Sequence, residues 1–178
     1  MTTKQQDYGA TAKIFHWTIA ALLLVQYPLG WLMPDIKRGM TPGVAMTVHI
    51  SLGMVILVLI AVRLIWRLTH PVAAQSSLPA WQHLSSEAVH WLLYLLVAVT
   101  CITGWAYANM RGWHVSLFGI APLPQIFAEG PGLGRTIGRL HETVNWILLA
   151  VVGVHVLAAI AHLAIYRDGV MQRMLPRR

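Results

Sequence analysis

The chain has 178 residues, of which 57% are hydrophobic and 11% charged, and its mean hydropathy is +0.60. A soluble domain carries about 25% charged residues, so this composition excludes an ordinary soluble domain and indicates an integral membrane protein. The net charge of +7 does not indicate nucleic-acid binding, because the basic residues are scattered between apolar runs. Cys101 is the only cysteine, so there is no disulfide framework and no CxxC or CxxCH motif.

Four apolar segments follow one another along the chain, each about the twenty residues needed to span a bilayer as a helix. They cover residues 14–33, 44–62, 88–108 and 144–166. We expect helices over about 12–34, 43–68, 82–108 and 139–167, in a single membrane domain of residues 1–178. The first segment is long for a signal peptide, and no small-residue cleavage site follows it, so we expect it to be retained. The predicted fold class is all-α, an integral membrane four-helix bundle.

The basic residues predict how this bundle is oriented. Four spans place both termini on one side, and cytoplasmic flanks carry an excess of lysine and arginine. With the termini inside, eight basic residues are cytoplasmic (Lys4, Lys13, Arg63, Arg67, Arg167, Arg173, Arg177, Arg178) and five are outside (Lys37, Arg38, Arg111, Arg135, Arg139). We therefore predict cytoplasmic termini. Tryptophans lie near the span ends, as Trp66, Trp91 and Trp113 do, and such positions are typical of side chains that anchor a helix at the membrane–water interface.

Two connecting segments are longer than the others. Residues 69–82 carry Pro and Ser and predict a cytoplasmic connector. Residues 109–138 mix aromatic and aliphatic residues with Gly and Pro, so we expect an outer interfacial loop that caps the bundle. Pro28 lies inside the first span and removes a backbone donor, which predicts a kink there.

The nine histidines carry the strongest functional signal, because an ionisable side chain at membrane depth is costly and indicates a functional site. His141 and His155 are fourteen residues apart on the fourth span. A helix rises 1.5 Å per residue, so they are separated by about 21 Å along the axis, and nearly four whole turns place them on nearly the same side. This spacing is typical of ligands to two cofactors stacked at opposite leaflets.

Each of these histidines has a partner at the same depth on another helix. The topology pairs His16 with His155 near the inner face and His49 with His141 near the outer face. Two imidazoles close both axial positions of a haem iron, which favours electron transfer over oxygen binding. We therefore predict two non-covalent, bis-histidine b-type haems, with these four histidines as the iron ligands.

Other residues suit the same geometry. Arg63, fourteen residues after His49, could pair with propionates of the inner haem. Small residues that would leave room for a flat macrocycle or a neighbouring helix are Gly30, Gly53 and Gly153. His162 lies two turns beyond His155, where it could exchange a proton with a quinone. His70, His83 and His114 are expected to be solvated or interfacial, whereas an interfacial role is less easily assigned to His90.

Histidines also serve in two other chemistries, metal binding and proton-coupled transport, and the sequence disfavours both. Zinc requires three or four ligands converging on one point, but these histidines separate into two distant pairs, and no HxxxH or HExxH motif occurs. A proton-coupled transporter would require more helices and repeats, and the spans carry no carboxylate near the midplane.

The sequence resembles the bacterial cytochrome b561 family, small four-helix dihaem cytochromes of the cytoplasmic membrane. The similarity is sharpest at KIFHW, at VHISLGMVILVLIAVRLIWRL and at LHETVNWILLAVVGVHVLAAIAHLAIYRDGVMQRMLPRR. It implies a multi-pass protein of the inner membrane, in contact with lipid, with the same two ligand pairs. The resemblance is weakest over residues 109–138.

The resemblance also implies an oxidoreductase that takes electrons from superoxide, or another donor, at the outer face and passes them to ubiquinone. Basic residues near the outer haem could attract superoxide, namely Lys37, Arg38, Arg135 and Arg139. The alternative is a haem-b anchor subunit that relays electrons between a hydrogenase or dehydrogenase partner and quinone. Co-purification with a large catalytic subunit would favour the anchor.

Overall fold

The computed structural model describes residues 7–34, 41–72 and 78–175. Four long helices dominate it: α1 (Ala10–Trp31), α2 (Val44–Thr69), α3 (Ala80–Met110) and α4 (Pro131–Ala161). The last helix continues into a π-helical turn, η1 (His162–Tyr166), and a short 3-10 helix, η2 (Met171–Arg173), follows. Between α3 and α4, β1 (Ser116–Leu117) pairs antiparallel with β2 (Ala121–Pro122).

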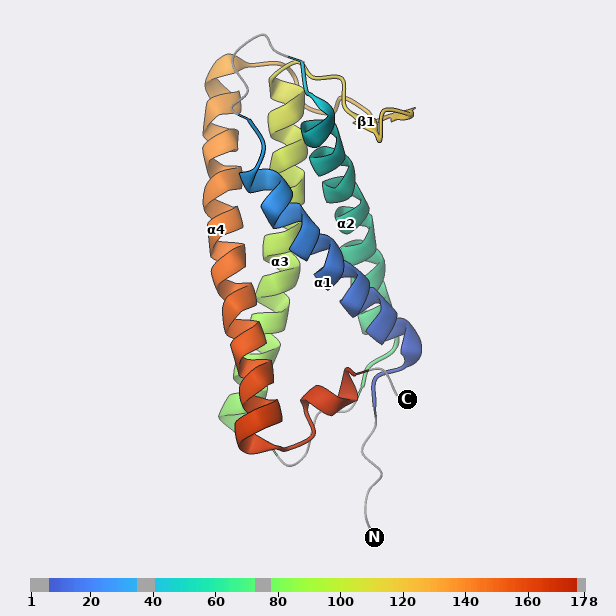
Figure 1. Cartoon of the computed structure of the whole chain (residues 1–178), viewed down its shortest axis with the longest axis vertical. Coiled ribbons are helices and arrows are strands. Elements are labelled where there is room, and N and C mark those ends of the chain that lie inside the picture. Colours follow the sequence, from blue (N-terminus) through green and yellow to red (C-terminus); the bar gives the residue numbers. More distant parts are fainter. Residues whose placement is uncertain (1–6, 35–40, 73–77, 176–178) are drawn as a thin grey trace.

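The helices form one elongated bundle in which α3 packs against α2 and α4, and α2 packs against α1 (Figure 1). The chain enters and leaves at the same end of the bundle, which we call the N/C end, and the β-hairpin projects at the opposite end, the hairpin end (Figure 1). All four helices are long and apolar enough to cross a membrane. The predicted membrane four-helix bundle is confirmed.

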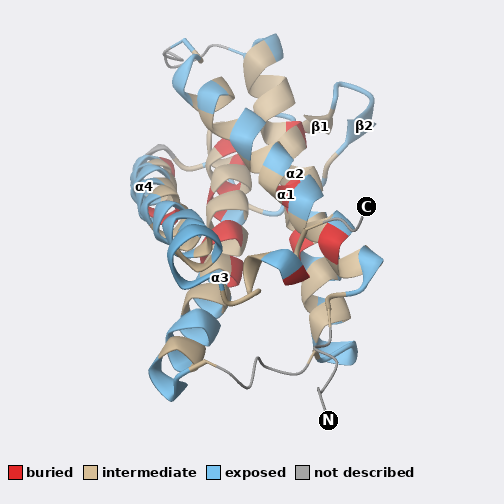
Figure 2. Cartoon of the chain, turned by 60° about the horizontal axis from the view of Figure 1, so that its bottom comes forward, coloured by how far each residue is buried: buried red, intermediate tan, exposed pale blue. Residues whose placement is uncertain are grey.

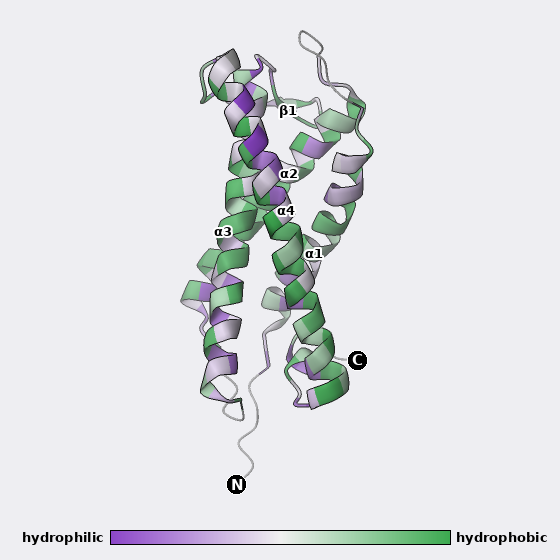
Figure 3. Ribbon diagram, turned by 90° about the vertical axis from the view of Figure 1, so that its left-hand side faces the viewer, coloured by the Kyte–Doolittle hydropathy of each residue, from purple (hydrophilic) through white to green (hydrophobic). Residues whose placement is uncertain are grey.

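The core is narrow, and apolar side chains also cover the outside of the bundle. Ile56 of α2 and Leu148 of α4 are each only 1% exposed, whereas Leu24, Ile65 and Leu157 are more than half exposed. Figure 2 shows buried positions facing the interior, and Figure 3 shows hydrophobic residues along most of the helical surface. Lipid is the solvent that such a surface requires, because exposing it to water would be unfavourable.

The fourth helix begins at Pro131, about eight residues before the expected start near residue 139. Gly130 is the N-cap residue, and proline suits the first helical position, where no backbone donor is needed. The first turns then pack closely against α3: a Cβ at Gly134 would lie 3.2 Å from Met110 Cβ, and one at Gly138 would lie 2.8 Å from the Tyr107 ring. Gly134 and Gly138 lie in the segment expected to be a loop, but they allow α4 to pack closely against α3.

The outer loop is consequently shorter than the expected residues 109–138, and part of it is folded against the helices. Trp113 is 7% exposed and packs with Ala108 and Val115, so it belongs to a small core at the hairpin end and is not an interfacial anchor. Ser51 of α2 joins the hairpin to the bundle, because its hydroxyl accepts a hydrogen bond from the Phe118 backbone N–H at 2.7 Å. In α1, helical structure continues through Pro28.

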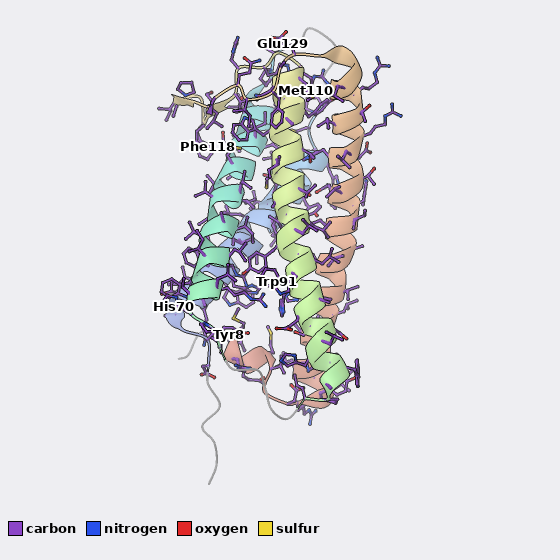
Figure 4. All side chains as sticks on the ribbon, turned by 180° about the vertical axis from the view of Figure 1, so that it is seen from behind. Tyr8, His70, Trp91, Met110, Phe118 and Glu129 are labelled. Carbon is purple, nitrogen blue, oxygen red and sulfur yellow. The ribbon has the colours of Figure 1, made fainter. Side chains whose placement is uncertain are left out.

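At the N/C end, the C-terminal segment returns across the start of α1. Lys13 Nζ donates a hydrogen bond to the Leu175 carbonyl at 2.7 Å, and Trp17 Nε1 donates to the Met174 carbonyl at 2.9 Å. The Arg173 guanidinium lies 5.2 Å from the ring centre of Tyr8, which Figure 4 labels at this end. These contacts bind the end of the chain to α1.

Candidate functional site

Four histidines from three helices form two imidazole pairs at different levels of the bundle. His16 of α1 and His155 of α4 have ring centroids 6.2 Å apart, nearer the N/C end. His49 of α2 and His141 of α4 have ring centroids 6.4 Å apart, nearer the hairpin end. The structure thus brings together both predicted pairs, and α4 contributes one imidazole to each.

The pair at the N/C end is surrounded by cationic and aromatic side chains. His90 of α3 approaches His155 with a centroid separation of 5.5 Å. The Arg63 guanidinium lies 5.6 Å from the Tyr94 ring centre, and Arg67 lies 5.1 Å from that of Trp91, which Figure 4 shows at this end. Both guanidinium groups lie 5.6 Å from the Tyr94 ring centre, and together they could bind carboxylates such as haem propionates.

At the hairpin end, the backbones of two neighbouring helices come close to the imidazole pair at glycine positions. A Cβ at Gly30 of α1 would lie 3.4 Å from His49 Cε1, and one at Gly104 of α3 would lie 2.9 Å from His141 Cε1. Glycine is therefore required at position 104 if the imidazole is to stay where it is. Both histidines are thus packed against a neighbouring helix at a position without a side chain.

Hydrogen bonding fixes the orientation of His141. Its Nδ1 lies 2.9 Å from the Thr100 carbonyl oxygen. Because a carbonyl can only accept, Nδ1 carries the proton, and the lone pair of Nε2 is left for a metal ion. On α1, Gln26 Nε2 donates to the His49 backbone carbonyl at 2.8 Å and so joins α1 to α2 at this level.

The arrangement fits a haem between the two rings of each pair. Two imidazole nitrogens bound to one metal ion at about 2.0–2.1 Å each would place the ring centroids roughly 6 Å apart. The separations of 6.2 and 6.4 Å agree with this value.

Each of the four helices carries two residues that are fourteen positions apart and belong to the two levels of the site. The two on α3 were not recognised from the sequence. The two residues are His16 and Gly30 on α1, His49 and Arg63 on α2, and His141 and His155 on α4. On α3 they are His90 at the N/C-end pair and Gly104 at the hairpin-end pair. The spacing itself could have identified the α3 residues, because each helix contributes one residue to each level.

The remaining predicted residues lie outside these two pairs. His162 Nδ1 is 2.6 Å from Asp168 Oδ2 at the N/C end. Arg135 and Arg139 are exposed on the first turns of α4, whereas Lys37 and Arg38 lie outside the described residues. Gly53 faces Gln26, and no atom lies within 4 Å of a Cβ built at Gly153.

The other histidines do not form a further metal site. His114 is exposed, and the His70 ring stacks on Trp66 with centroids 3.8 Å apart. In residues 7–34, 41–72 and 78–175, no group of three or more His, Cys, Asp or Glu side chains is arranged to hold a metal ion.

Comparison with known proteins identifies the family. The family model of prokaryotic cytochrome b561 matches residues 7–177. The chain belongs to the prokaryotic cytochrome b561 family. Membership confirms the resemblance seen in the sequence, and it establishes haem binding and electron transfer in a multi-pass protein of the bacterial inner membrane.

Individual relatives in this cytochrome b561 family are distant in sequence but match in length. The chain is 26% identical to "Cytochrome b561 homolog 2" of Escherichia coli over 178 residues, covering 98% of the chain and 94% of the relative. It is 28% identical to "Probable superoxide oxidase CybB" of Yersinia pestis over 164 residues, covering 92% of each. It is also 27% identical to "Cytochrome b561 homolog 1" of E. coli, covering 96% of the chain and 98% of the relative.

Proposed function

We propose that this protein is a dihaem cytochrome that oxidises superoxide at the hairpin end and reduces ubiquinone at the N/C end. The observation that carries this proposal is the pair of facing imidazoles at each of two levels, linked by His141 and His155 on one helix. The relative from Yersinia pestis is named a probable superoxide oxidase, which supports superoxide as the donor.

In this proposal, His16 and His155 hold one haem and His49 and His141 hold the other. Bound haem would supply a one-electron carrier at each level, held by the two imidazoles of that level. The Thr100 carbonyl keeps His141 in the tautomer that can bind iron through Nε2. Arg63, Arg67 and His90 would bind the propionates of the haem at the N/C end.

We further propose that the N/C end is cytoplasmic. Among the described basic residues, Lys13, Arg63, Arg67, Arg167 and Arg173 belong to the N/C end, and Arg111, Arg135 and Arg139 to the hairpin end. An excess of lysine and arginine marks the cytoplasmic side. Arg135 and Arg139 are exposed at the outer end, where positive charge would attract the superoxide anion.

The overall reaction balances as two superoxide anions, one ubiquinone and two protons giving two molecules of oxygen and one ubiquinol. Each superoxide loses one electron, and the quinone gains both electrons and both protons. We place quinone reduction beside His162, because this histidine lies seven residues beyond His155 on the same side of the helix and at the N/C end. An imidazole is well suited to donate a proton there.

Stopped-flow spectroscopy of the purified holoprotein tests this proposal. Rapid haem reduction by superoxide, followed by reoxidation when ubiquinone-1 is added, is the expected result. Failure of superoxide to reduce the haem, together with co-purification of a large catalytic subunit that does reduce it, would instead establish an anchor subunit.

A further inference from the structure

The turn after α4 contains a hydrogen-bonded histidine–aspartate pair that belongs to neither of the two imidazole pairs. His162 Nδ1 and Asp168 Oδ2 are 2.6 Å apart, and each side chain is 18% exposed. The pair lies beside the proposed quinone site, at the end of the helix that carries His155.

The backbone holds Asp168 against His162 by reversing sharply. The π-helical turn His162–Tyr166 ends at Arg167, which has φ +50°, and Gly169 follows with φ +82°. These left-handed residues turn the chain back on the helix. The Val170 backbone N–H then donates to Asp168 Oδ1 at 3.1 Å, so each carboxylate oxygen has its own partner.

The chemistry of the pair determines which nitrogen of His162 can react. An ionised carboxylate only accepts hydrogen bonds, so Nδ1 donates its proton to Asp168 and Nε2 is left for exchange. Partial burial opposes ionisation of Asp168, but the hydrogen bonds from His162 and Val170 outweigh it and hold the pKa of Asp168 below its ordinary value. Asp168 therefore remains a carboxylate at neutral pH.

We propose that Asp168 is a positioning residue that orients His162 so that His162 Nε2 can deliver a proton to the bound quinone. This inference rests on the proposed function, which places quinone beside His162. Quinone accepts two electrons and two protons; His162 gives one of the protons and recovers it from water at the N/C end. Asp168 keeps its charge throughout, as an orienting carboxylate does beside a catalytic histidine.

The test compares two oxidants of the pre-reduced holoprotein. Ubiquinone-1 takes up protons on reduction, whereas ferricyanide takes up electrons alone. We expect His162→Gln and Asp168→Asn to slow oxidation by ubiquinone-1 by about 10-fold or more, because acid–base catalysis contributes about 10²–10⁴-fold. Both variants should show a larger solvent deuterium isotope effect with ubiquinone-1 and an unchanged rate with ferricyanide. Glu87→Gln, which changes an exposed carboxylate on α3 at the same end, is the matched control.

Each outcome separates this inference from the function on which it rests. If His162→Gln reduces ubiquinone-1 at the wild-type rate, the proposed quinone position is wrong. If His162→Gln is slow and Asp168→Asn is not, the role of Asp168 is overturned while the quinone position stands. Equal slowing with both oxidants would show a purely structural role and also overturn the inference. Asp168→Ser provides the same comparison if the asparagine variant does not fold.

Discussion

Gly104 of α3 and His141 of α4 approach so closely that a Cβ at Gly104 would lie 2.9 Å from His141 Cε1 and 3.2 Å from Nδ1. Real Cβ atoms essentially never come so near. The imidazole cannot move freely, because its Nδ1 is bonded to the Thr100 carbonyl. The absence of a side chain at position 104 therefore sets the position of one proposed iron ligand.

Gly104→Ala should selectively weaken haem binding at the hairpin end. The added methyl group displaces His141, and changes in the groups that orient a metal ligand typically cost 10–100-fold in affinity. The measurement is the haem-to-polypeptide ratio, which should fall towards one. Gly132→Ala is the control, since no atom lies within 4 Å of a Cβ at Gly132, and it should leave the ratio unchanged. An unchanged ratio in Gly104→Ala would contradict the assigned contact.

Arg63→Gln should lower the reduction potential of the haem at the N/C end. Arg63 is close enough to interact electrostatically with His16 and His155, and its positive charge disfavours the oxidised iron. Since about 1.4 kcal/mol corresponds to about 59 mV for one electron, we expect a decrease on the order of 60 mV. Redox titration checks this, with Arg167→Gln as control. A potential that rises, or a change confined to the other haem, would refute the placement of Arg63.

Replacing both Arg135 and Arg139 by glutamine should slow the reaction with superoxide at low ionic strength. Exposed positive charge raises the encounter rate of an anion, by about 10-fold or more in favourable cases. The effect should vanish near 1 M salt, where the screening length is about 3 Å. Stopped-flow rates across a salt series measure it. Equal rates for the variant and wild type at every salt concentration would show that these residues do not steer superoxide.

Lys13→Met should loosen the C-terminal segment. It removes the hydrogen bond from Nζ to the Leu175 carbonyl, a loss of about 1 kcal/mol that should raise local opening roughly fivefold. Trypsin should then cleave faster after Arg173, which is only 7% exposed, and mass spectrometry can follow the released peptide. Thr69→Val removes an exposed hydrogen bond at the same end and should have no effect. Unaltered cleavage in Lys13→Met would mean that other contacts hold the segment.

The membrane spans and the two histidine pairs could be predicted because each depends on a strong periodic signal. A run of about twenty apolar residues has few alternatives to a spanning helix. The fourteen-residue interval between His141 and His155 is nearly four turns, so depth and direction follow from helix geometry alone. The family assignment from the sequence is confirmed by the match over residues 7–177. Iron ligation by the four histidines stays a prediction.

The features that could not be predicted from the sequence depend on contacts between segments that are distant along the chain. The start of α4 reads as a loop because Gly132, Gly134 and Gly138 weaken a helix in isolation. Two of these glycines instead pack against α3, at Met110 and Tyr107. Trp113 is buried for a similar reason, because the hairpin folds back against α2 and α3. No local pattern specifies such tertiary contacts.

The most direct test of two haem sites sharing one helix is the haem content and absorption spectrum of the wild type, His141→Ala and His155→Ala. We predict two low-spin haems per polypeptide in the wild type. Each variant should lose low-spin coordination at one site and retain the other, with His141→Ala affecting the hairpin end and His155→Ala the N/C end. A single haem in the wild type, or two intact low-spin haems in either variant, would contradict the account.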